Sequence, residues 1–510
     1  MKIKFVMPPA FDETKLSMLP YGMCVLVGYL RGLGFEVAQA DIMIKIRRKN
    51  IPRSILGDRP FNINLARNPN RMAGYLFGQK EDLQLDNLSK DIVSLENFAG
   101  FDIVGISVHS IFQFPFALLM AKYIKKTYNP TIIMGGPFIT LRGVEFMKKA
   151  QFVDFMVRGE GEIPLKSLLN SNSDIKNLYA EDIPGLAYRK GNEVLANKRA
   201  SLPAEEMSPP DFGGLNLDLY RYVINGKPEV IFTYQFTKGC RGRCCFCTHH
   251  IVSDVLETKS PEKVARELKE ICAKYNAKYF YICDSTVNPN YVGLKKICDA
   301  IKKEGPVIAW GSLAKLDNMT EDLAKSLKDS GCKFLRFGFE SGSNRILKMM
   351  GKAHTTDSAL ASIKNTHKYG IKNLGTFISG FPGENNSDIA LTRDFIKRIS
   401  PYVFELSCGI CCIEPGSPMR DNPERFGMKN LQVRDREFID YEEFPRNAYK
   451  FEEINGLSWK DKRLQQISSQ KEVIKTIKKY VVNIKEQSKL RRLIPVFLYT
   501  LLGENKYRFD

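Results

Sequence analysis

Alternating strand-like and helix-like segments run through most of this chain, and they constrain its fold more than any other feature. In the first third, apolar strands are predicted over residues 2–7, 36–42, 102–108, 131–134 and 153–157, and helices over 21–33, 114–128 and 141–149. Repeated strand–helix units form parallel sheets with helices on both faces. We therefore expect an α/β, doubly wound (Rossmann-like) domain over residues 1–169.

The same alternation returns in the second half of the chain. Six strands are predicted there, over residues 230–236, 278–283, 307–313, 333–339, 372–378 and 403–413. Six strand–helix units in series predict a partial (βα)6 barrel over residues 228–425, with its chemistry at the carboxyl ends of the strands. Residues 170–227, with the Pro-rich segment 204–211, are expected to be a linker, and 426–510 a helical C-terminal region.

Cys240, Cys244 and Cys247 lie in one short loop directly after the first predicted barrel strand. Three thiolates hold three irons of a four-iron, four-sulfur cluster and leave the fourth iron open, whereas a cluster that only carries electrons has four cysteine ligands. A Cys3His zinc site completed by His249 or His250 is the alternative. A disulfide is disfavoured because no secretory signal is seen and the other cysteines are scattered.

The spacing Cys-x3-Cys-x-aromatic-Cys, with Phe246 as the aromatic residue, resembles the signature of the radical S-adenosylmethionine (SAM) enzymes. The resemblance implies that the open iron binds the amino and carboxylate groups of SAM, and that an electron from the cluster releases a 5′-deoxyadenosyl radical. Later strand ends resemble the same family at residues 281–288, 338–342, 346–352, 375–384 and 414–418.

The strand ends supply the candidate SAM-binding residues: Phe246, Asp284, Ser285, Glu340, Ser341, Ile378 and Gly380. The four polar residues suit the ammonium and ribose groups, Phe246 and Ile378 suit the adenine, and Gly380 permits close backbone approach. As an alternative, Glu340 forms a salt bridge with Arg336 or Lys333. Arg241 and Arg243 are expected either to steady an anionic cluster or to be solvated.

The first domain resembles the cobalamin-binding domain of the same group of enzymes, at residues 20–30, 104–108, 135–137 and 157–162. Its candidate cofactor-binding residues are Gly105, Ser107, Gly135, Gly136, Gly159 and Glu160. The Asp-x-His-x-x-Gly motif is absent, and His109 is the only histidine in the first 240 residues. Cobalamin is therefore expected without a protein histidine on cobalt. A sheet with tight turns and no ligand is the alternative.

Together the resemblances imply a cobalamin-dependent radical SAM methyltransferase acting on an unactivated carbon. A radical rearrangement, oxidation or ring formation without methyl transfer is the runner-up. An RNA methylthiotransferase is disfavoured because the first domain has only Cys24 to offer a further cluster. A basic, zinc-dependent RNA-binding protein is the alternative that is not an enzyme.

The net charge of +19 suits an anionic substrate or an acidic peptide but does not choose between partners. We expect a small-molecule or peptide substrate, an electron donor such as flavodoxin or ferredoxin, no nucleic acid, and a cytoplasmic location. No apolar run is long enough to span a bilayer, although the basic tail offers a membrane-surface contact. Cys408, Cys411 and Cys412 are expected to be structural, with a place near the substrate or on an extra cluster as the alternative.

Overall fold

The computed structural model describes residues 1–10, 18–47, 65–66, 68–78, 80–170, 180–224, 226–253, 255–414, 416–433, 449–454 and 456–481. The chain forms two compact units, and the first gives way to the second between Tyr220 and Arg221. Most of residues 45–79, and the tail beyond residue 481, lie outside the described residues.

The first unit contains a seven-stranded sheet in the order β2-β1-β3-β4-β5-β6-β7. Its strands are β1 (Lys2–Met7), β2 (Glu36–Asp41), β3 (Ile103–Ser107), β4 (Thr131–Gly135), β5 (Phe155–Val157), β6 (Leu186–Lys190) and β7 (Glu193–Ala196). The first five strands are parallel, and their order is one of the two common doubly wound arrangements. The predicted fold of this region is confirmed.

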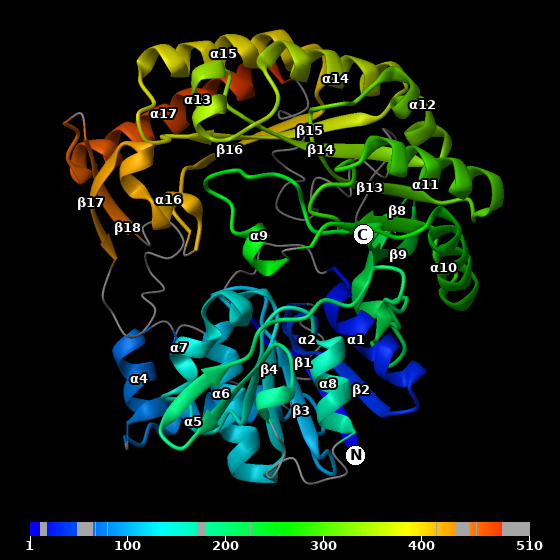
Figure 1. Cartoon of the computed structure of the whole chain (residues 1–510), viewed down its shortest axis with the longest axis vertical. Helices are drawn as coiled ribbons and strands as arrows, with labels where there is room; N and C mark the ends of the chain where they lie inside the picture. The colour runs from blue at the N-terminus through cyan, green and yellow to red at the C-terminus, as the bar shows by residue number, and fades with distance from the viewer. Residues whose placement is uncertain are drawn as a thin grey trace. The chain divides into compact units, whose positions relative to one another are not determined.

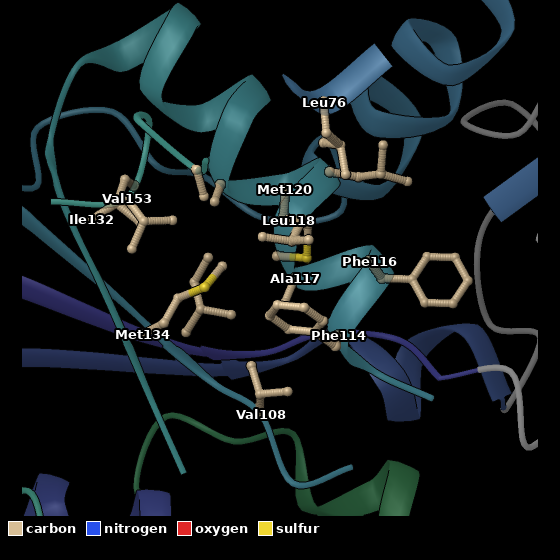
Figure 2. Packing of buried hydrophobic residues seen from close by; sticks show 14 of the residues in the cluster. Leu76, Val108, Phe114, Phe116, Ala117, Leu118, Met120, Ile132, Met134 and Val153 are labelled. Atoms are coloured by element: carbon tan, nitrogen blue, oxygen red, sulfur yellow. The ribbon is translucent and has the colours of Figure 1, made fainter. Parts of the chain in front are cut away.

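Helices cover this sheet: α1 (Tyr21–Gly32), α2 (Ile42–Arg47), α4 (Pro69–Phe77), α5 (Leu83–Val93), α6 (Phe114–Tyr128), α7 (Val144–Met147) and α8 (Glu162–Leu169) (Figure 1). Helix α6 is buried along nearly its whole first half, from Phe114 to Ala121. Its apolar side chains pack on Val108, Ile132 and Met134 from the sheet (Figure 2). Such a helix, apolar on every side, must lie inside a core.

The segment expected to be a linker differs from that expectation. Strands β6 and β7 within it form an antiparallel extension of the first sheet. The Pro-rich stretch packs on α1, where the Asp211 N–H donates to Cys24 O at 2.9 Å. Gly28 makes this approach feasible, since a Cβ there would lie 2.3 Å from Pro209 O. The domain boundaries at 169, 227 and 425 stay predictions.

The second unit contains the six predicted parallel strands in sequence order, with β8 (Arg221–Ile224) antiparallel at one edge. They are β9 (Lys227–Tyr234), β12 (Tyr279–Ile282), β13 (Ala309–Ala314), β14 (Cys332–Glu340), β15 (Lys372–Ser379) and β16 (Glu405–Ile410). The partial barrel is therefore confirmed.

Helices follow the barrel strands on the outer face of this sheet: α10 (Pro261–Tyr275), α11 (Tyr291–Glu304), α12 (Glu321–Asp329), α13 (Asn344–Met349), α14 (Thr356–Lys368) and α15 (Asn386–Ile399) (Figure 1). Ser260 and Thr320 cap α10 and α12, each accepting a hydrogen bond from the helix backbone. Helix α15 begins at Asn386, where Asn385 and Asp388 form its capping box.

The C-terminal region is less helical than expected. It contains α16 (Pro418–Asp421), then an antiparallel pair, β17 (Met428–Val433) and β18 (Tyr449–Glu453), before α17 (Trp459–Tyr480). The apolar positions Val473, Ile477 and Val481 are buried rather than available to a membrane surface. Within the described part of the chain, no helix combines the length and apolarity needed to cross a membrane.

Candidate site at the carboxyl end of the barrel

The three-cysteine loop lies at the carboxyl end of the first barrel strand, as predicted. It runs from β10 (Thr237–Lys238) to α9 (His249–Val252), and β10 pairs with β11 (Glu257–Thr258). Inside the loop, the Cys245 N–H donates to Met350 O at 3.1 Å and Cys245 O accepts from the Met419 N–H at 3.0 Å. The loop is therefore fixed to segments that follow the fourth and sixth barrel strands.

Two glycines let other backbone segments approach this loop. Gly239 has φ +83°, and a Cβ there would lie 1.9 Å from Val255 O. Gly351 has φ +75°, and a Cβ there would lie 2.8 Å from Arg243 O. Both positions combine a left-handed backbone with a close carbonyl, so a side chain would displace the loop.

Asp284 anchors the strand that leads into the loop. Its carboxylate is buried and accepts hydrogen bonds from the N–H groups of Phe236 (2.9 Å) and Thr237 (3.0 Å). Burial raises the pKa of Asp284 well above its usual range, while the two N–H groups act in the opposite direction. Both of its oxygens are therefore engaged by backbone N–H groups, and the expected contact of Asp284 with a ligand stays a prediction.

Ser285, just after β12, contacts His249 at the end of the cysteine loop. Its Oγ lies within hydrogen-bond distance of His249 Nε2. Burial lowers the pKa of His249, and His250 adds to the effect. The imidazole expected as a zinc ligand in the alternative interpretation is therefore directed to the end of β12.

The thiolate donors are surrounded by groups that favour negative charge. The Gly242 N–H donates to Cys240 Sγ at 3.2 Å, and the His249 N–H donates to Cys247 Sγ at 3.4 Å. Burial raises the pKa of Cys244, and the ammonium groups of Lys352 and Lys315 act in the opposite direction. Hydrogen bonds to sulfur and nearby charge are the means by which proteins tune iron–sulfur clusters, so this donor set fits an anionic cluster.

The counter-charge does not come from the residues that the sequence suggested. Arg241 and Arg243 are exposed, whereas the side chain of Lys352 is only 14% exposed. Among the described residues, no three His, Cys, Asp or Glu side chains converge to hold a single metal ion. A four-iron cluster gives each cysteine its own iron, and its ligands therefore do not meet at one point.

Glu340 and Lys352 form a buried ion pair beside the cysteine loop. Lys352 Nζ lies 2.8 Å from Glu340 Oε1 and 5.5 Å from the centre of the Phe246 ring. Glu340 has φ +60°, and a Cβ at Gly338 would lie 2.3 Å from Glu340 Oε1. Burial tends to lower the pKa of Lys352, but Glu340 and Cys244 outweigh it and the pKa is raised.

The partner of Glu340 was missed at the level of sequence. Arg336 and Lys333 were the expected candidates because they lie on the same strand. Lys352 instead follows α13, twelve residues after Glu340. Only the turn of the chain through α13 brings the two together.

Ser341 supports the same loop. It is buried, its Oγ accepts from the Ser343 N–H at 3.1 Å, and it lies 3.4 Å from Thr392 Oγ1 on α15. These contacts fix the loop to α15, and the expected contact of Ser341 with a ligand stays a prediction.

Phe246 and Ile378 border one hydrophobic cluster, as expected for two residues that flank the same ligand. The buried members of the cluster are Cys245, Ile346, Met350, Phe381, Cys411, Ile413, Met419, Phe426, Met428 and Phe451. Gly380, at the end of β15, has φ +78° and is covered by Gln466. The described geometry therefore gathers Phe246, Ile378 and Glu340 beside the cysteine loop, whereas Gly380 lies against α17.

Of the three cysteines Cys408, Cys411 and Cys412, the first lies within the sixth strand and the other two follow it. Strand β16 ends at Ile410, so Cys411 and Cys412 lie beyond it and the two-residue period no longer applies. Cys411 is buried, and its pKa is raised well above the usual range by burial, then by Cys412 and Cys245. A role for these cysteines near a substrate stays a prediction.

The inner face of the barrel carries Arg336, a cation that the sequence suggested only as a partner of Glu340. Phe337 and Phe339 are neighbours, and Phe339 contacts Phe395 of α15, so odd-numbered residues of β14 face the helices. Arg336 is therefore on the inner face, where its charge partly opposes the rise that burial causes in the pKa of the half-buried Tyr281. Within the described ranges, no carboxylate forms a salt bridge with Arg336.

A second set of candidates lies at the carboxyl ends of β3, β4 and β5 in the first unit. Ser107 pairs with Gly135, and both are half-buried, as are Gly136 and Gly159. Gly136 has φ +104°, and a Cβ there would lie 2.6 Å from Val108 O. Half-buried glycines at strand ends leave the backbone open to a ligand, which fits the tail of a bound nucleotide.

Two other candidates in the first unit have structural roles. Gly105 is buried in mid-strand, and a Cβ there would lie 2.5 Å from the Phe5 ring. Glu160 accepts from the Leu202 N–H at 2.8 Å and from Ser201 Oγ at 3.1 Å, so it holds the segment that follows β7. His109 is exposed just after β3, and its backbone N–H donates to Gln113 Oε1.

Comparison with protein families gives two matches. The family model of the Radical SAM superfamily matches residues 234–396, which include the cysteine loop and the four barrel strands β12 to β15. The model of the B12 binding domain matches residues 60–169, which include β3, β4 and β5.

Individual relatives extend these matches. An uncharacterized methyltransferase of Pyrococcus horikoshii is 31% identical over 63% of this chain and 69% of its own length. The anaerobic magnesium-protoporphyrin IX monomethyl ester cyclase of Synechocystis is 24% identical over 54% of each chain, so only about half of that relative is spanned. The structure of the radical SAM methyltransferase TsrM of Kitasatospora setae, with cobalamin and a [4Fe-4S] cluster, aligns at TM-score 0.61 with 16% identity, over 86% of this chain and 82% of TsrM, which shows a shared fold.

Proposed function

The chain belongs to the radical SAM superfamily and carries a B12 binding domain before the barrel, and from this premise we propose that it methylates an unactivated carbon of its substrate. The observation that carries the proposal is the three-cysteine loop, held at the carboxyl end of β9 beside the Glu340–Lys352 pair. The methyltransferase relative supports methyl transfer as the outcome.

When bound, the cluster supplies the electron that splits SAM into methionine and a 5′-deoxyadenosyl radical, and cobalamin supplies the methyl group. In this proposal Cys240, Cys244 and Cys247 ligate three irons, and Lys352 offsets the negative charge of the cluster. Glu340 accepts from the SAM ammonium, and Phe246 and Ile378 flank the adenine. The buried cluster of apolar side chains beside Phe246 limits water access to the radical.

The first unit is proposed to bind cobalamin at the carboxyl ends of its strands, through Ser107, Gly135, Gly136 and Gly159. No Asp-x-His-x-x-Gly motif is present in the chain. Cobalamin without a protein histidine on cobalt is therefore part of the proposal.

Arg336 favours a substrate with an anionic group. It is a cation on the inner face of the barrel, and an anion reaching it exchanges water for a charge-assisted hydrogen bond. We propose a small molecule or peptide with a carboxylate or phosphate, an electron donor such as flavodoxin or ferredoxin, and a cytoplasmic location.

Radical ring formation without methyl transfer is the second candidate, and the cyclase relative favours it. Both reactions begin with the same cleavage of SAM, so they differ only in the fate of the methyl group. The zinc-dependent RNA-binding alternative has no support from the family matches.

The experiment is an anaerobic incubation of the reconstituted protein with cobalamin, a chemical reductant and SAM labelled in its methyl group. Methyl transfer predicts that the label appears in methylcobalamin, and that unlabelled S-adenosylhomocysteine and 5′-deoxyadenosine are formed as well. Deoxyadenosine without labelled cobalamin would favour the second candidate. The absence of both products would contradict both candidates.

A further inference from the structure

Helix α17 lies along the last barrel strand and occupies the place where a closed barrel would continue. An exposed edge strand has unpaired backbone groups that a protein must cover. Here glutamine side chains cover them: Gln470 Nε2 donates to Cys408 O at 3.0 Å, and Gln466 Nε2 donates to Cys411 O at 3.5 Å. The helix therefore pairs with the edge of β16 through its side chains.

The same helix face holds the loop that follows β15, residues 380–384. Gln466 Nε2 donates to Gly380 O at 3.0 Å, and Gln465 Nε2 donates to Glu384 O at 3.2 Å. Lys462 Nζ donates to Phe381 O at 2.9 Å. The three donor residues lie within four positions of each other on one side of α17. One helix therefore fixes three carbonyl groups of the loop.

Strand β18 also contacts this loop, through Glu453. Lys462 is fully buried and forms an ion pair with Glu453 at 2.7 Å. The other contact of Glu453 is with the loop, whose Gly383 N–H donates to Glu453 Oε1 at 2.8 Å. The loop is thus held through its carbonyl groups by α17 and through an N–H by β18.

Gln466 also sets the shape of the loop by packing. Gly380 has φ +78°, and a Cβ there would lie 2.3 Å from Gln466 Cγ and 3.0 Å from Gln466 Cα. The glycine is therefore enclosed by the helix. Any displacement of Gln466 frees the residue that follows Ile378 and Ser379 at the strand end.

We infer that α17 positions the 380–384 loop, and through it the adenosine part of SAM, an inference that rests on the proposed function. Gln466 and Lys462 are positioning residues in this account, because they act through the backbone of the loop. The sequence distance explains why the role is hidden: Gln466 lies 86 residues after Gly380.

The test compares Gln466→Ala with Gln470→Ala. Gln466→Ala loses the bonds to Gly380 O in the loop and to Cys411 O, whereas Gln470→Ala loses only the bond to Cys408 O and none to the loop. The measurement is the SAM concentration that gives half-maximal 5′-deoxyadenosine formation under a chemical reductant, together with iron content and the change in the cluster EPR signal when SAM is added.

Gln466→Ala is expected to raise this SAM concentration about tenfold, with full iron content and a smaller change in maximal rate. Gln470→Ala is expected to stay within about twofold of the wild type. If Gln466→Ala does not fold, Gln465→Ala takes its place, with an expected rise of about threefold.

An unchanged SAM requirement in the folded variant, or equal losses in Gln466→Ala and Gln470→Ala, overturns the inference. Wild-type protein that binds no SAM and forms no deoxyadenosine instead overturns the proposed function. The two failures are therefore distinguishable.

Discussion

The ammonium of Lys352 lies 2.8 Å from the carboxylate of Glu340 beside the cysteine loop, with the Glu340 side chain buried and the Lys352 side chain partly buried. A buried ion pair is costly to form and is weak evidence for stability. Its position between Cys244 and Phe246 makes it better suited to a cofactor than to the fold alone. The first two predictions test this relationship.

Lys352→Met removes the cation that most strongly opposes the rise in the pKa of Cys244. Loss of positive charge disfavours the reduced cluster, so its midpoint potential is expected to fall by some tens of millivolts. An EPR-monitored redox titration measures this change. Lys348→Met, an exposed lysine on the preceding helix, is the matched control. Equal potentials in the wild type and Lys352→Met would contradict the assigned role.

Glu340→Gln keeps the shape of the side chain and removes its charge. If Glu340 accepts from the SAM ammonium, the Kd for SAM is expected to rise at least about tenfold in the variant. This rise corresponds to a loss of about 1.4 kcal/mol of binding free energy. Equilibrium binding of SAM to the anaerobic, cluster-loaded protein measures it. Glu424→Gln, an exposed glutamate, serves as the control. Unchanged affinity would assign the pair to the fold.

Asp284→Ala removes the acceptor for two backbone N–H groups beneath the cysteine loop. Leaving buried donors unpaired costs about 1–3 kcal/mol each, so both thermal stability and iron content per chain are expected to drop. Iron analysis and thermal unfolding check the two effects. Full iron loading in a variant as stable as Asp299→Ala, at an exposed position, would show that the anchor is dispensable.

Glu384 gives the chain a predicted pH dependence. Burial raises its pKa to about 7, although the Gly380 N–H and Lys462 act in the opposite direction and Asp388 adds to the rise. Because the folded pKa lies above the unfolded value of about 4.5, its contribution to stability is complete below pH 4.5 and is lost as the pH rises through 7.

Glu384→Gln removes this titration. The variant is expected to gain stability relative to the wild type between about pH 4.5 and 7, by up to about 3 kcal/mol. Thermal unfolding of the anaerobic proteins at several pH values measures the difference. A constant difference across that range would show that Glu384 does not titrate there.

The strand order of the barrel and the place of the cysteine loop could be predicted because both follow from local pattern. Apolar runs marked the six strands, and a parallel barrel puts the loop after the first strand at the reactive end. The roles of Asp284, Ser341 and Glu160 could not be predicted, because each bonds to a segment that only the tertiary fold brings close. The sequence shows that a carboxylate ends a strand, but its partner depends on the turn above it.

The same limit explains the linker and the tail. A Pro-rich stretch reads as flexible, but Gly28 on α1 lets it pack closely. The glutamines of α17 read as solvent-facing polar residues, yet Gln466 is buried against Gly380. Polar residues that cap strand edges have no periodic signal, so their burial appears only in the structure.

The most direct test of the central claim is the EPR spectrum of the anaerobically reconstituted, reduced protein with and without SAM. We predict a [4Fe-4S] signal that shifts when SAM is added and that is lost when Cys240, Cys244 and Cys247 are all replaced by alanine. A protein that holds one zinc ion at these cysteines, or a cluster whose signal SAM leaves unchanged, would contradict the account.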